Sequence, residues 1–439
     1  DSALALGPLM HEFGWATDDW DRLAAGSLVG HLIECGAQVT GGLFTDWRLV
    51  PGWDDMGFPI AECFADGSCV ITKPAGTGGL VNRATVAEQL VYEIGDPARY
   101  LLPDVTCDFS QVTLTDAGPD RVHVSGARGL PPTGSYKASV TYPFGSRATA
   151  QMMIGGREAR AKAERVADAI LARTRRLFAE RGLADYRDVS VEVLGSEATY
   201  GPHTRHAETR EVVLKIGVAH TDAAALEIFA REIFPAATAM AQGLTGFAGG
   251  RPSVQPMIRL FSCLVDKALV PVTVEVDGER LDIAVRAHGA LSQDGAALIE
   301  AAHGREAPTV GAAHGREGLT VPLYRLAHGR SGDKGDSANI GVLARHPALV
   351  ALLRAQLTAT AVADYFAHLA LGPVARYEWP GVDGFNFVLE RALGGGGTGS
   401  LRHDPQGKAY AQLLLDFELA VPPDLMPLLA DDVVLPGVA

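Results

Sequence analysis

The sequence predicts an α/β protein in two parts, a layered α/β core followed by a smaller α+β domain at the C-terminal end. At 439 residues the chain is too long for one simple hydrophobic core. Helical and strand-like patterns alternate in the later part of the core, as in layered α/β proteins. The segment A-A-H-G-R-E occurs twice in a tract that reads as a duplicated flexible linker. We therefore expect the core over 1–288, the linker over 289–319 and the C-terminal domain over 320–439.

The first 42 residues predict two helices, because apolar side chains recur there at helical spacing. Gly14 is expected to end the first helix. Asp18 or Asp19 is expected to cap the second, which continues to Gly36.

Residues 51–81 contain short strand-like runs separated by turns, and 138–142 is a further strand-like run. Thr85-x-x-Glu88 matches a capping box, which predicts a helix over 86–94. This part of the core is therefore expected to mix short strands with one capped helix.

The alternation of elements is clearest in the second half of the core. A stretch rich in Ala and Arg predicts a helix over 158–181. Strands are expected at 189–194 and 211–218, and a second helix over 223–242 with Thr221 as its N-cap. This order favours an α/β layer over a helical bundle.

The sequence pattern of the C-terminal domain predicts a small sheet with helices on one face. A glycine-rich loop is expected between its first two strands. The predicted elements are strands at 321–326, 339–343, 374–379 and 385–391, helices at 346–357 and 362–369, and a final helix after Pro405.

Composition excludes several classes of partner. The net charge of −14 disfavours nucleic acid and acidic membrane surfaces, so an anion would need a local site of backbone amides and cations. Five cysteines without C-x-x-C spacing disfavour a disulfide framework or a structural zinc site and favour a reducing compartment. No apolar stretch approaches the ~20 residues of a membrane span, and no signal peptide is expected.

The densest polar cluster is H-G-R-S-G-D-K-G-D-S-A-N-I-G-V, over 328–342. Its glycines would allow successive N–H groups to converge on one anion, and its cations would add positive charge. The alternative is a long solvated hairpin in which Gly, Asp, Ser and Asn only form turns. The first interpretation predicts a site for a carboxylate or a thioester oxygen, formed by Arg330, Ser331, Asp333, Lys334 and Asn339.

Ser331-x-x-Lys334 also matches the S-x-x-K motif of penicillin-recognising hydrolases. That motif requires the serine at the start of a helix with the lysine one turn later. Gly332 and Gly335 oppose a helix here, so this interpretation is rejected.

Two further glycine runs are candidates for ligand contact. In K-P-A-G-T-G-G, Lys73, the Thr77 hydroxyl and the amides of Gly78 and Gly79 could hold an anion before the capped helix. The alternative there is a plain Pro/Gly turn. The run A-L-G-G-G-G-T-G-S-L-R over 392–402 lacks the lysine of a phosphate loop, and both ligand contact and a plain loop stay open.

His31 and Glu34 are spaced i and i+3, so on a helix they would share one face. They predict a general base with its orienting group, beside the thiol of Cys35; the alternative is a structural contact. His203-x-x-His206 lies among Gly and Pro and lacks the spacing H-E-x-x-H, so no metal site is predicted.

Several segments in order resemble the acyclic terpene utilisation (AtuA) family, over nearly the whole chain. The resemblance implies an α/β core followed by a ferredoxin-like C-terminal domain. It also implies a link to citronellol and geraniol breakdown operons, which include acyl-CoA carboxylases and hydratases. The segments are D-S-A-L-A-L-G-P-L (1–9), G-H-L-I-E-C-G-A-Q-V-T-G-G (30–42), G-F-P-I-A-E (57–62), V-I-T-K-P-A-G-T-G-G-L-V (70–81), Q-L-V-Y-E-I-G-D-P (89–97), V-S-G-A-R-G (124–129), G-F-A-G-G-R-P (246–252), R-S-G-D-K-G-D-S-A-N-I-G-V (330–342), F-N-F-V-L and L-G-G-G-G-T (385–398).

The chain departs from the family pattern in two places. Family members carry a further N-terminal stretch before D-S-A-L, which is absent from this sequence. Their usual K-G-G-N-A-N reads K-G-D-S-A-N here, with Asp336 and Ser337 in place of Gly and Asn. The added charge beside Lys334 is expected to weaken anion binding.

These features predict a catabolic enzyme of acyclic terpene or branched-chain acid degradation, of lyase or hydro-lyase type, acting on a carboxylate or an acyl-CoA. Lys334, His31 and Glu34 are the predicted catalytic residues. The alternative is a non-catalytic binding or assembly subunit of an acyl-CoA carboxylase, because no complete catalytic signature is present. We expect a cytoplasmic protein, as a homo-oligomer or with a carboxylase partner, and the sequence assigns no cofactor.

Overall fold

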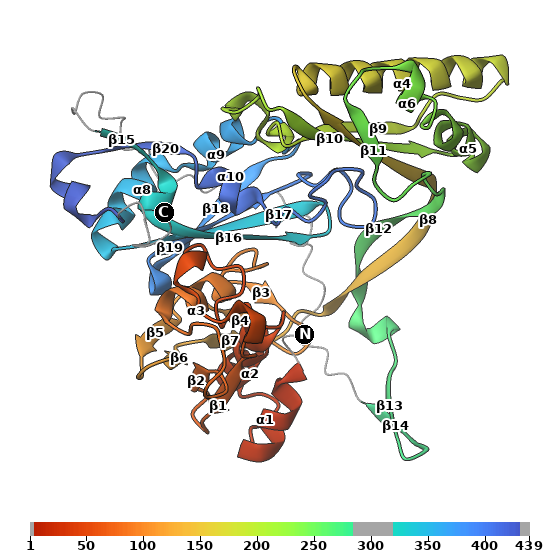
Figure 1. The fold of residues 1–439 in the computed structure, drawn as a ribbon. Helices are drawn as coiled ribbons and strands as arrows, with labels where there is room; N and C mark the ends of the chain where they lie inside the picture. Colours follow the sequence, from red (N-terminus) through yellow and green to blue (C-terminus); the bar gives the residue numbers. More distant parts are fainter. Residues whose placement is uncertain (1–3, 284–318, 431–439) are drawn as a thin grey trace.

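Three large clusters of buried apolar side chains organise the computed structural model, which describes residues 4–283 and 319–430. The first cluster belongs mainly to an N-terminal module, the second to a C-terminal domain, and the third to a lobe formed by the middle of the chain (Figure 1). The mixture of helices and strands confirms the predicted α/β class. Both copies of A-A-H-G-R-E lie outside the described residues.

The N-terminal module combines three helices with two small antiparallel sheets, of strand order β1-β2-β6-β5 and β3-β4-β7. Leu28 and Leu90 on two of the helices lie in the same buried cluster as Ile71 on a strand. The elements are α1 (Leu6–Phe13), α2 (Trp20–Ile33), α3 (Arg83–Leu90), β1 (Ile60–Cys63), β2 (Cys69–Thr72), β3 (Tyr100–Leu101), β4 (Thr106–Asp108), β5 (Thr113–Asp116), β6 (Val122–Ser125) and β7 (Arg128–Leu130).

The ends of the first two helices follow the sequence closely. Gly14 ends α1 in the left-handed conformation, with φ of 64°, as predicted. Asp19 is the residue before α2, which ends at Ile33 rather than continuing to Gly36.

The predicted capping box of the third helix was wrong by one turn. Asn82 is the N-cap of α3, and its Oδ1 accepts a hydrogen bond from Thr85 N at 2.9 Å. Thr85 Oγ1 accepts one in return from Asn82 N at 3.0 Å. Glu88 therefore lies inside the helix, where its carboxylate is free to contact another segment.

The middle lobe is an antiparallel sheet of order β11-β8-β10-β9, with β12 also paired to β8. Helices α4 and α5 pack against it, and α4 matches the prediction to within one residue at each end. The second predicted helix is shorter than expected, because its N-cap is Asp222 and a segment with Pro235 separates α5 from α6. The elements are β8 (Ser135–Gly155), α4 (Ala159–Glu180), β9 (Asp188–Leu194), β10 (Glu211–His220), α5 (Ala223–Glu232), α6 (Ala236–Ala239), β11 (Leu244–Phe247) and β12 (Gln255–Asp266).

The C-terminal domain is an antiparallel sheet of order β16-β17-β19-β18. Its helices lie on one side of the sheet and the N-terminal module lies on the other (Figure 1). A second pair, β15-β20, flanks this sheet. The elements are β15 (Leu319–Pro322), β16 (Ala327–Lys334), β17 (Ser337–Ala344), α8 (Val350–Gln356), α9 (Ala359–Tyr365), β18 (Val374–Trp379), β19 (Gly384–Leu389), α10 (Tyr410–Leu414) and β20 (Glu418–Val421).

Two strands beyond the lobe form a separate hairpin, β13 (Val272–Val276) and β14 (Glu279–Ile283). The hairpin projects from the body of the molecule (Figure 1). It follows a short turn, η5 (Lys267–Leu269), at the end of β12.

Candidate functional site

The two faces of the C-terminal sheet have different partners, as the alternation of side chains in β17 shows. Ala338, Ile340 and Val342 belong to the buried cluster of the C-terminal domain. Asn339 and Gly341 contact residue Val91 of the N-terminal module instead. Successive side chains of a strand point to opposite faces, so one strand takes part in both surfaces. Of the predicted site residues, Arg330, Lys334 and Asn339 lie on the face that meets the N-terminal module.

Two glycines of this region allow the N-terminal module to approach the sheet closely. A Cβ at Gly341 would lie 2.6 Å from Cβ of Val91 and closer still to a Val91 methyl group. A Cβ at Gly332 would lie 2.5 Å from Cγ of Glu93 and 2.7 Å from Cε2 of Tyr92. These glycines therefore serve packing between the two parts of the chain.

The predicted nest of backbone amides over 328–342 was wrong. Most of H-G-R-S-G-D-K is strand β16, which pairs with β17 from Ala327–Ala344 to Lys334–Ser337, so its main chain belongs to the ladder. Only Gly335 and Asp336 form the turn, with Gly335 at φ of 68°. The alternative of a long solvated hairpin was also wrong, because β16 and β17 are mostly buried.

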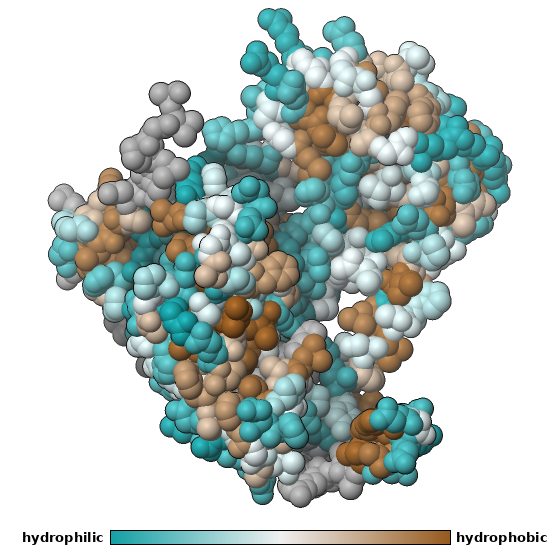
Figure 2. Space-filling view, turned by 60° about the horizontal axis from the view of Figure 1, so that its bottom comes forward, coloured by the Kyte–Doolittle hydropathy of each residue, from teal (hydrophilic) through white to brown (hydrophobic). Residues whose placement is uncertain are grey.

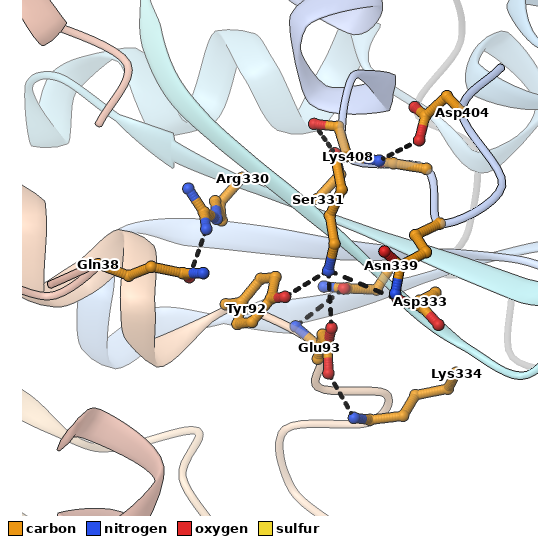
Figure 3. Close-up of polar contacts among 12 residues, drawn as sticks. Gln38, Tyr92, Glu93, Arg330, Ser331, Asp333, Lys334, Asn339, Asp404 and Lys408 are labelled. Atoms are coloured by element: carbon orange, nitrogen blue, oxygen red, sulfur yellow. Dashed lines mark hydrogen bonds and ion pairs between the residues drawn. The ribbon is translucent and has the colours of Figure 1, made fainter. Parts of the chain in front are cut away.

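Arg330 is a buried cation that joins the sheet to the N-terminal module. Its Nη1 donates to the carbonyl oxygen of Leu43 at 3.0 Å, and its Nη2 donates to the side-chain oxygen of Gln38 (Figure 3). The guanidinium lies over the ring of Tyr92, 4.7 Å from the centroid. The charge of Arg330 is thus held inside the junction by three residues of the N-terminal module.

Glu93 is the centre of the ionic contacts at the junction (Figure 3). Lys334 Nζ lies 2.7 Å from Glu93 Oε2, and Lys408 Nζ lies 3.0 Å from Glu93 Oε1. Lys408 also donates to the hydroxyl of Tyr92 and lies 3.5 Å from Asp333. Burial opposes ionisation of Glu93, but hydrogen bonds from Lys334 and Tyr92 outweigh it and lower its pKa to about 2. Two ammonium groups therefore hold one carboxylate at this point.

Asn339 and Asn386 form a buried amide pair between the sheet and the N-terminal module. Asn339 Nδ2 donates to Val91 O at 2.9 Å, and Asn339 Oδ1 accepts from Glu93 N at 2.9 Å. Asn386 Nδ2 donates to Ile94 O at 2.6 Å, while its Oδ1 accepts from Asn339. The end of α3 is thus hydrogen-bonded to the C-terminal sheet by side chains.

We expect Asn386→Leu to destabilise the folded chain by about 1–3 kcal/mol, because it leaves Ile94 O and the second amide hydrogen of Asn339 without partners. Chemical denaturation measures this loss. A loss of stability alone does not identify a bridging role, because Asn82→Ala, which removes only an N-cap, could cause an equal loss. The decisive measurement is therefore the rate of proteolysis at the junction, which we expect to increase. Unchanged proteolysis would contradict a bridging role for the pair.

Ser331 and Asp336 are directed away from the N-terminal module. Ser331 Oγ donates to Gly407 O at 2.7 Å and accepts from Ala411 N at 2.9 Å, which fixes α10 to the sheet. Asp336 Oδ1 accepts from Gly395 N at 2.7 Å. The glycine run over 392–402 thus provides main-chain donors for an anion, and that anion is the carboxylate of Asp336.

Glu88 is a buried acid at the junction that the sequence did not single out as functional. Its Oε1 accepts from Thr45 N at 3.1 Å, and its side chain is almost fully enclosed. Burial raises its pKa to about 8, and the nearby Arg330 opposes that rise. Its only sequence signal was its place in the capping motif.

Asp46 forms a second polar contact with the C-terminal domain that the sequence did not predict. Arg345 donates to both oxygens of Asp46 at 2.6 Å, and His328 Nε2 lies 3.0 Å from Asp46 Oδ2. Burial opposes ionisation of Asp46, but these hydrogen bonds hold its pKa well below its usual range. The sequence carries no signal for this contact, because Asp46 and Arg345 are 299 positions apart.

His31 and Glu34 do not form the predicted helical pair, because α2 ends at Ile33 and Glu34 is extended. His31 Nε2 donates to Gln89 O at 3.0 Å, and its Nδ1 is buried without a hydrogen-bond partner. Burial lowers its pKa to about 4, so the imidazole is neutral at pH 7. Glu34 is half-buried, its pKa is raised by burial, and Lys334 and Glu93 act on it electrostatically. Of the two, only Glu34 is partly exposed to solvent beside the ionic cluster.

The Lys73 loop is a self-contained turn and not an open anion site. Lys73 Nζ donates to Thr77 O at 2.8 Å and pairs with Asp120 at 3.2 Å, and Thr77 Oγ1 donates to Pro74 O at 2.7 Å. The amides of Gly78 and Gly79 donate to carbonyl oxygens of the preceding loop, both at 2.8 Å. The predicted donors therefore already have partners within the module.

His203 and His206 line a cavity of about 580 Å³ between the middle lobe and the C-terminal domain. His203 stacks on Tyr365 at 3.9 Å and contacts its carbonyl oxygen. Arg205 pairs with Glu418 at the same cavity, at 3.3 Å. Within the described residues, no three His, Cys, Asp or Glu side chains are placed to hold a metal ion.

Three of the nine non-glycine residues that have positive φ in the described chain lie around the ionic cluster. Cys35, Leu43 and Glu93 have φ of 64°, 59° and 57°, which non-glycine residues rarely adopt. Leu43 and Glu93 both bind cations of β16, and Cys35 lies near Arg330. Such strain collects at functional sites, where surrounding contacts hold it. The junction is therefore the candidate functional site.

The fold and this junction define a class of protein, an α/β core whose appended α+β domain closes on the N-terminal module through buried polar contacts. Residues 1–276 match the model of the acyclic terpene utilisation family protein AtuA, and residues 321–420 match the AtuA ferredoxin-like domain. The first match covers more than half of the 439 residues, and the chain therefore belongs to the AtuA family.

No curated protein and no solved structure matches the chain. The second family match confirms the predicted ferredoxin-like domain at the C-terminal end. Across residues 4–283 and 319–430, no helix combines the length and the apolar character required to cross a membrane.

Proposed function

We propose that the chain is a catabolic enzyme that acts on a branched carboxylic acid or its CoA thioester, by a lyase or hydro-lyase reaction. Family membership implies involvement in acyclic terpene utilisation. The observation that carries the finer proposal is the convergence of Arg330, Lys334 and Lys408 on Glu93 and Tyr92. Two of these cations are reachable, since the side chains of Lys334 and Lys408 are 52% and 37% exposed.

Exposed apolar side chains near Arg330 fit the other half of such a substrate. Leu43, whose carbonyl binds Arg330, has an exposed side chain, and the ring of the exposed Phe58 lies beside the Cβ position of Gly36. An isoprenoid acid is a branched apolar chain ending in a carboxylate, so in this proposal its chain would contact these apolar side chains and its carboxylate would bind the ammonium groups. In this proposal the substrate carboxylate or thioester oxygen competes with Glu93 for Lys334 and Lys408.

The acid–base role is assigned to Glu34, whose pKa is raised by burial. Lys334 supplies positive charge to the developing oxyanion. His31 is not assigned a proton-transfer step, because it is buried and its Nε2 donates to backbone carbonyls.

Titration calorimetry with a branched C10 acid and its CoA thioester tests this proposal. We expect Lys334→Ala and Lys408→Ala each to weaken binding by about 10-fold or more, the loss typical of a charge-assisted hydrogen bond. Lys162→Ala on α4 is the matched control, since it removes the same charge away from the junction. Binding that is unchanged in both junction variants would refute the assignment of the site.

A second candidate function is a non-catalytic subunit associated with an acyl-CoA carboxylase. The observation that favours it is that Lys334 and Lys408 already pair with Glu93 within the chain, while Arg330 donates to Leu43 and Gln38. Purification from a terpene-grown host separates the two functions. Stoichiometric co-purification with a carboxylase and no turnover by the isolated chain would favour the subunit, whereas turnover by the isolated chain would favour the enzyme.

A further inference from the structure

The hairpin β13–β14 has one apolar face that nothing in the described chain covers. Residues directly opposite in an antiparallel pair share a face, and the pairs Val272–Ile283 and Val274–Leu281 lie on the same face as Val276. Four of these side chains, Val274, Val276, Leu281 and Ile283, are 41–54% exposed. The opposite face is polar. Hydrophobic residues on this arm are visible at the lower right of Figure 2.

The turn before this hairpin is anchored to the body of the molecule, but the hairpin itself does not pack substantially on other described elements. Lys267, at the turn before it, is buried and donates to Pro103 O at 2.7 Å, while its N–H donates to Gly134 O at 3.0 Å. Among the described elements, each hairpin strand packs substantially only on the other. A two-stranded hairpin alone is marginally stable in water, so its apolar face needs a partner surface.

The ribbon formed by β8 and β12 has a second uncovered apolar stripe. Below the lobe, over 135–145 and 258–266, these two strands pair with each other and with no other described strand, which leaves both outer edges open in the described chain. Val140 lies opposite Phe261 on one face, and the two are 47% and 58% exposed. The same face carries Tyr136, Ala138, Tyr142, Cys263 and Val265. None of these residues belongs to a described buried cluster.

We propose that the apolar face of the hairpin of one copy packs on the apolar stripe of the ribbon of a second copy, and that the exchange is reciprocal. Each copy then supplies one hairpin and one ribbon, so a two-fold dimer covers both hairpin faces and both of these ribbon faces. Two twisted two-stranded sheets packed face to face form the unit of a β-sandwich, about 10 Å apart.

Charge and area both fit a second copy as the occupant. The hairpin face carries one charge, Glu279 at its tip, and the exposed stripe of the ribbon is uncharged, because Arg259 at its upper end lies over Phe144 and beside Gly395. With a net charge of −14, two copies repel each other unless the contact surfaces are nearly uncharged, as these are. Reciprocity doubles the buried area, and specific interfaces bury roughly 1,200–2,000 Å² in total.

Analytical ultracentrifugation of the full chain tests the dimer, with variants that come in matched neighbouring pairs. Val274→Lys alters the apolar face of the hairpin, and Thr273→Lys adds the same charge on its polar face. Phe261→Lys alters the apolar face of the ribbon, and Ser262→Lys is its counterpart on the other face. We expect the apolar-face variants to raise the dimer dissociation constant about 100-fold or more, while the two controls stay near wild type.

Mixing the two defective variants distinguishes the proposed exchange from a hairpin packed on a hairpin. In a mixture of Val274→Lys and Phe261→Lys, one of the two junctions pairs an unaltered hairpin with an unaltered ribbon. We therefore expect the mixture to associate more tightly than either variant alone. A monomeric wild-type chain at all concentrations, or a wild-type dimer without this complementation, would overturn the proposal. Circular dichroism confirms that each variant is folded.

Discussion

Replacing Gly341 by alanine should destabilise the folded chain by about 1–3 kcal/mol, because the added methyl group overlaps with Val91 in a packed junction. Neither side can yield easily. Gly341 is held in register between β16 and β19, and Val91 directly follows α3 in the N-terminal module. Relief therefore requires the sheet and the module to separate, which also lengthens the hydrogen bonds of Asn339. Thermal unfolding measures the loss of stability.

Gly95→Ala is the matched control for this prediction. Gly95 lies at the same junction, yet a Cβ there meets no atom within 4 Å and its backbone does not require glycine. We expect the melting temperature of Gly95→Ala to stay close to that of the wild type. If both variants lost stability equally, close approach at Gly341 would not be the cause.

Glu88→Gln should make the chain more stable at alkaline pH. The pKa of Glu88 is raised by burial to about 8 in the folded state, so the folded protein keeps its proton while the unfolded chain loses it from about pH 4.5 upward. The wild type therefore loses stability as pH rises from there to about 8. Glutamine is always neutral and can still accept from Thr45 N. The stability advantage of the variant should increase by on the order of 3 kcal/mol between pH 5.5 and pH 8.5.

Urea denaturation at the two pH values measures this difference. Glu93 does not contribute to the change between pH 5.5 and pH 8.5. Its pKa in the folded state is about 2, so its stabilising contribution is lost only in acid. Glu164→Gln on the surface of α4 is the control, and we expect its effect to change little with pH. An advantage of Glu88→Gln that is constant across the window would show that Glu88 ionises normally in the folded state.

Local patterns predicted many elements of this fold correctly. The Ala- and Arg-rich helix was placed within one residue of α4, and the strand expected at 339–343 lies within β17. Gly14 was identified as a helix end from its sequence position alone. These predictions depended on hydrogen bonds between residues close in sequence, which side-chain periodicity and capping residues report directly.

The site was harder to predict, because the sequence identified its residues by chemical type but did not show which segment their side chains face. Arg330, Lys334 and Asn339 do come together, but with Gln38, Glu93 and Val91, from a segment more than 240 positions away. The glycines among them were expected to open the backbone to a ligand, whereas Gly332 and Gly341 admit the N-terminal module. An anion site and a polar packing surface would both have this mixture of ionic residues and glycines. Sequence spacing therefore could not distinguish an anion site from a polar packing surface.

The sequence by itself determined the family, the mixed α/β class and the alternation that gives β16 and β17 two distinct faces. Only the tertiary structure decided that the polar face meets the N-terminal module, and that Glu93 is the carboxylate between Lys334 and Lys408. The physical reason is that a strand's alternation is set by its own backbone geometry. The partner of each face is set by contacts between distant segments, which depend on how all the modules pack.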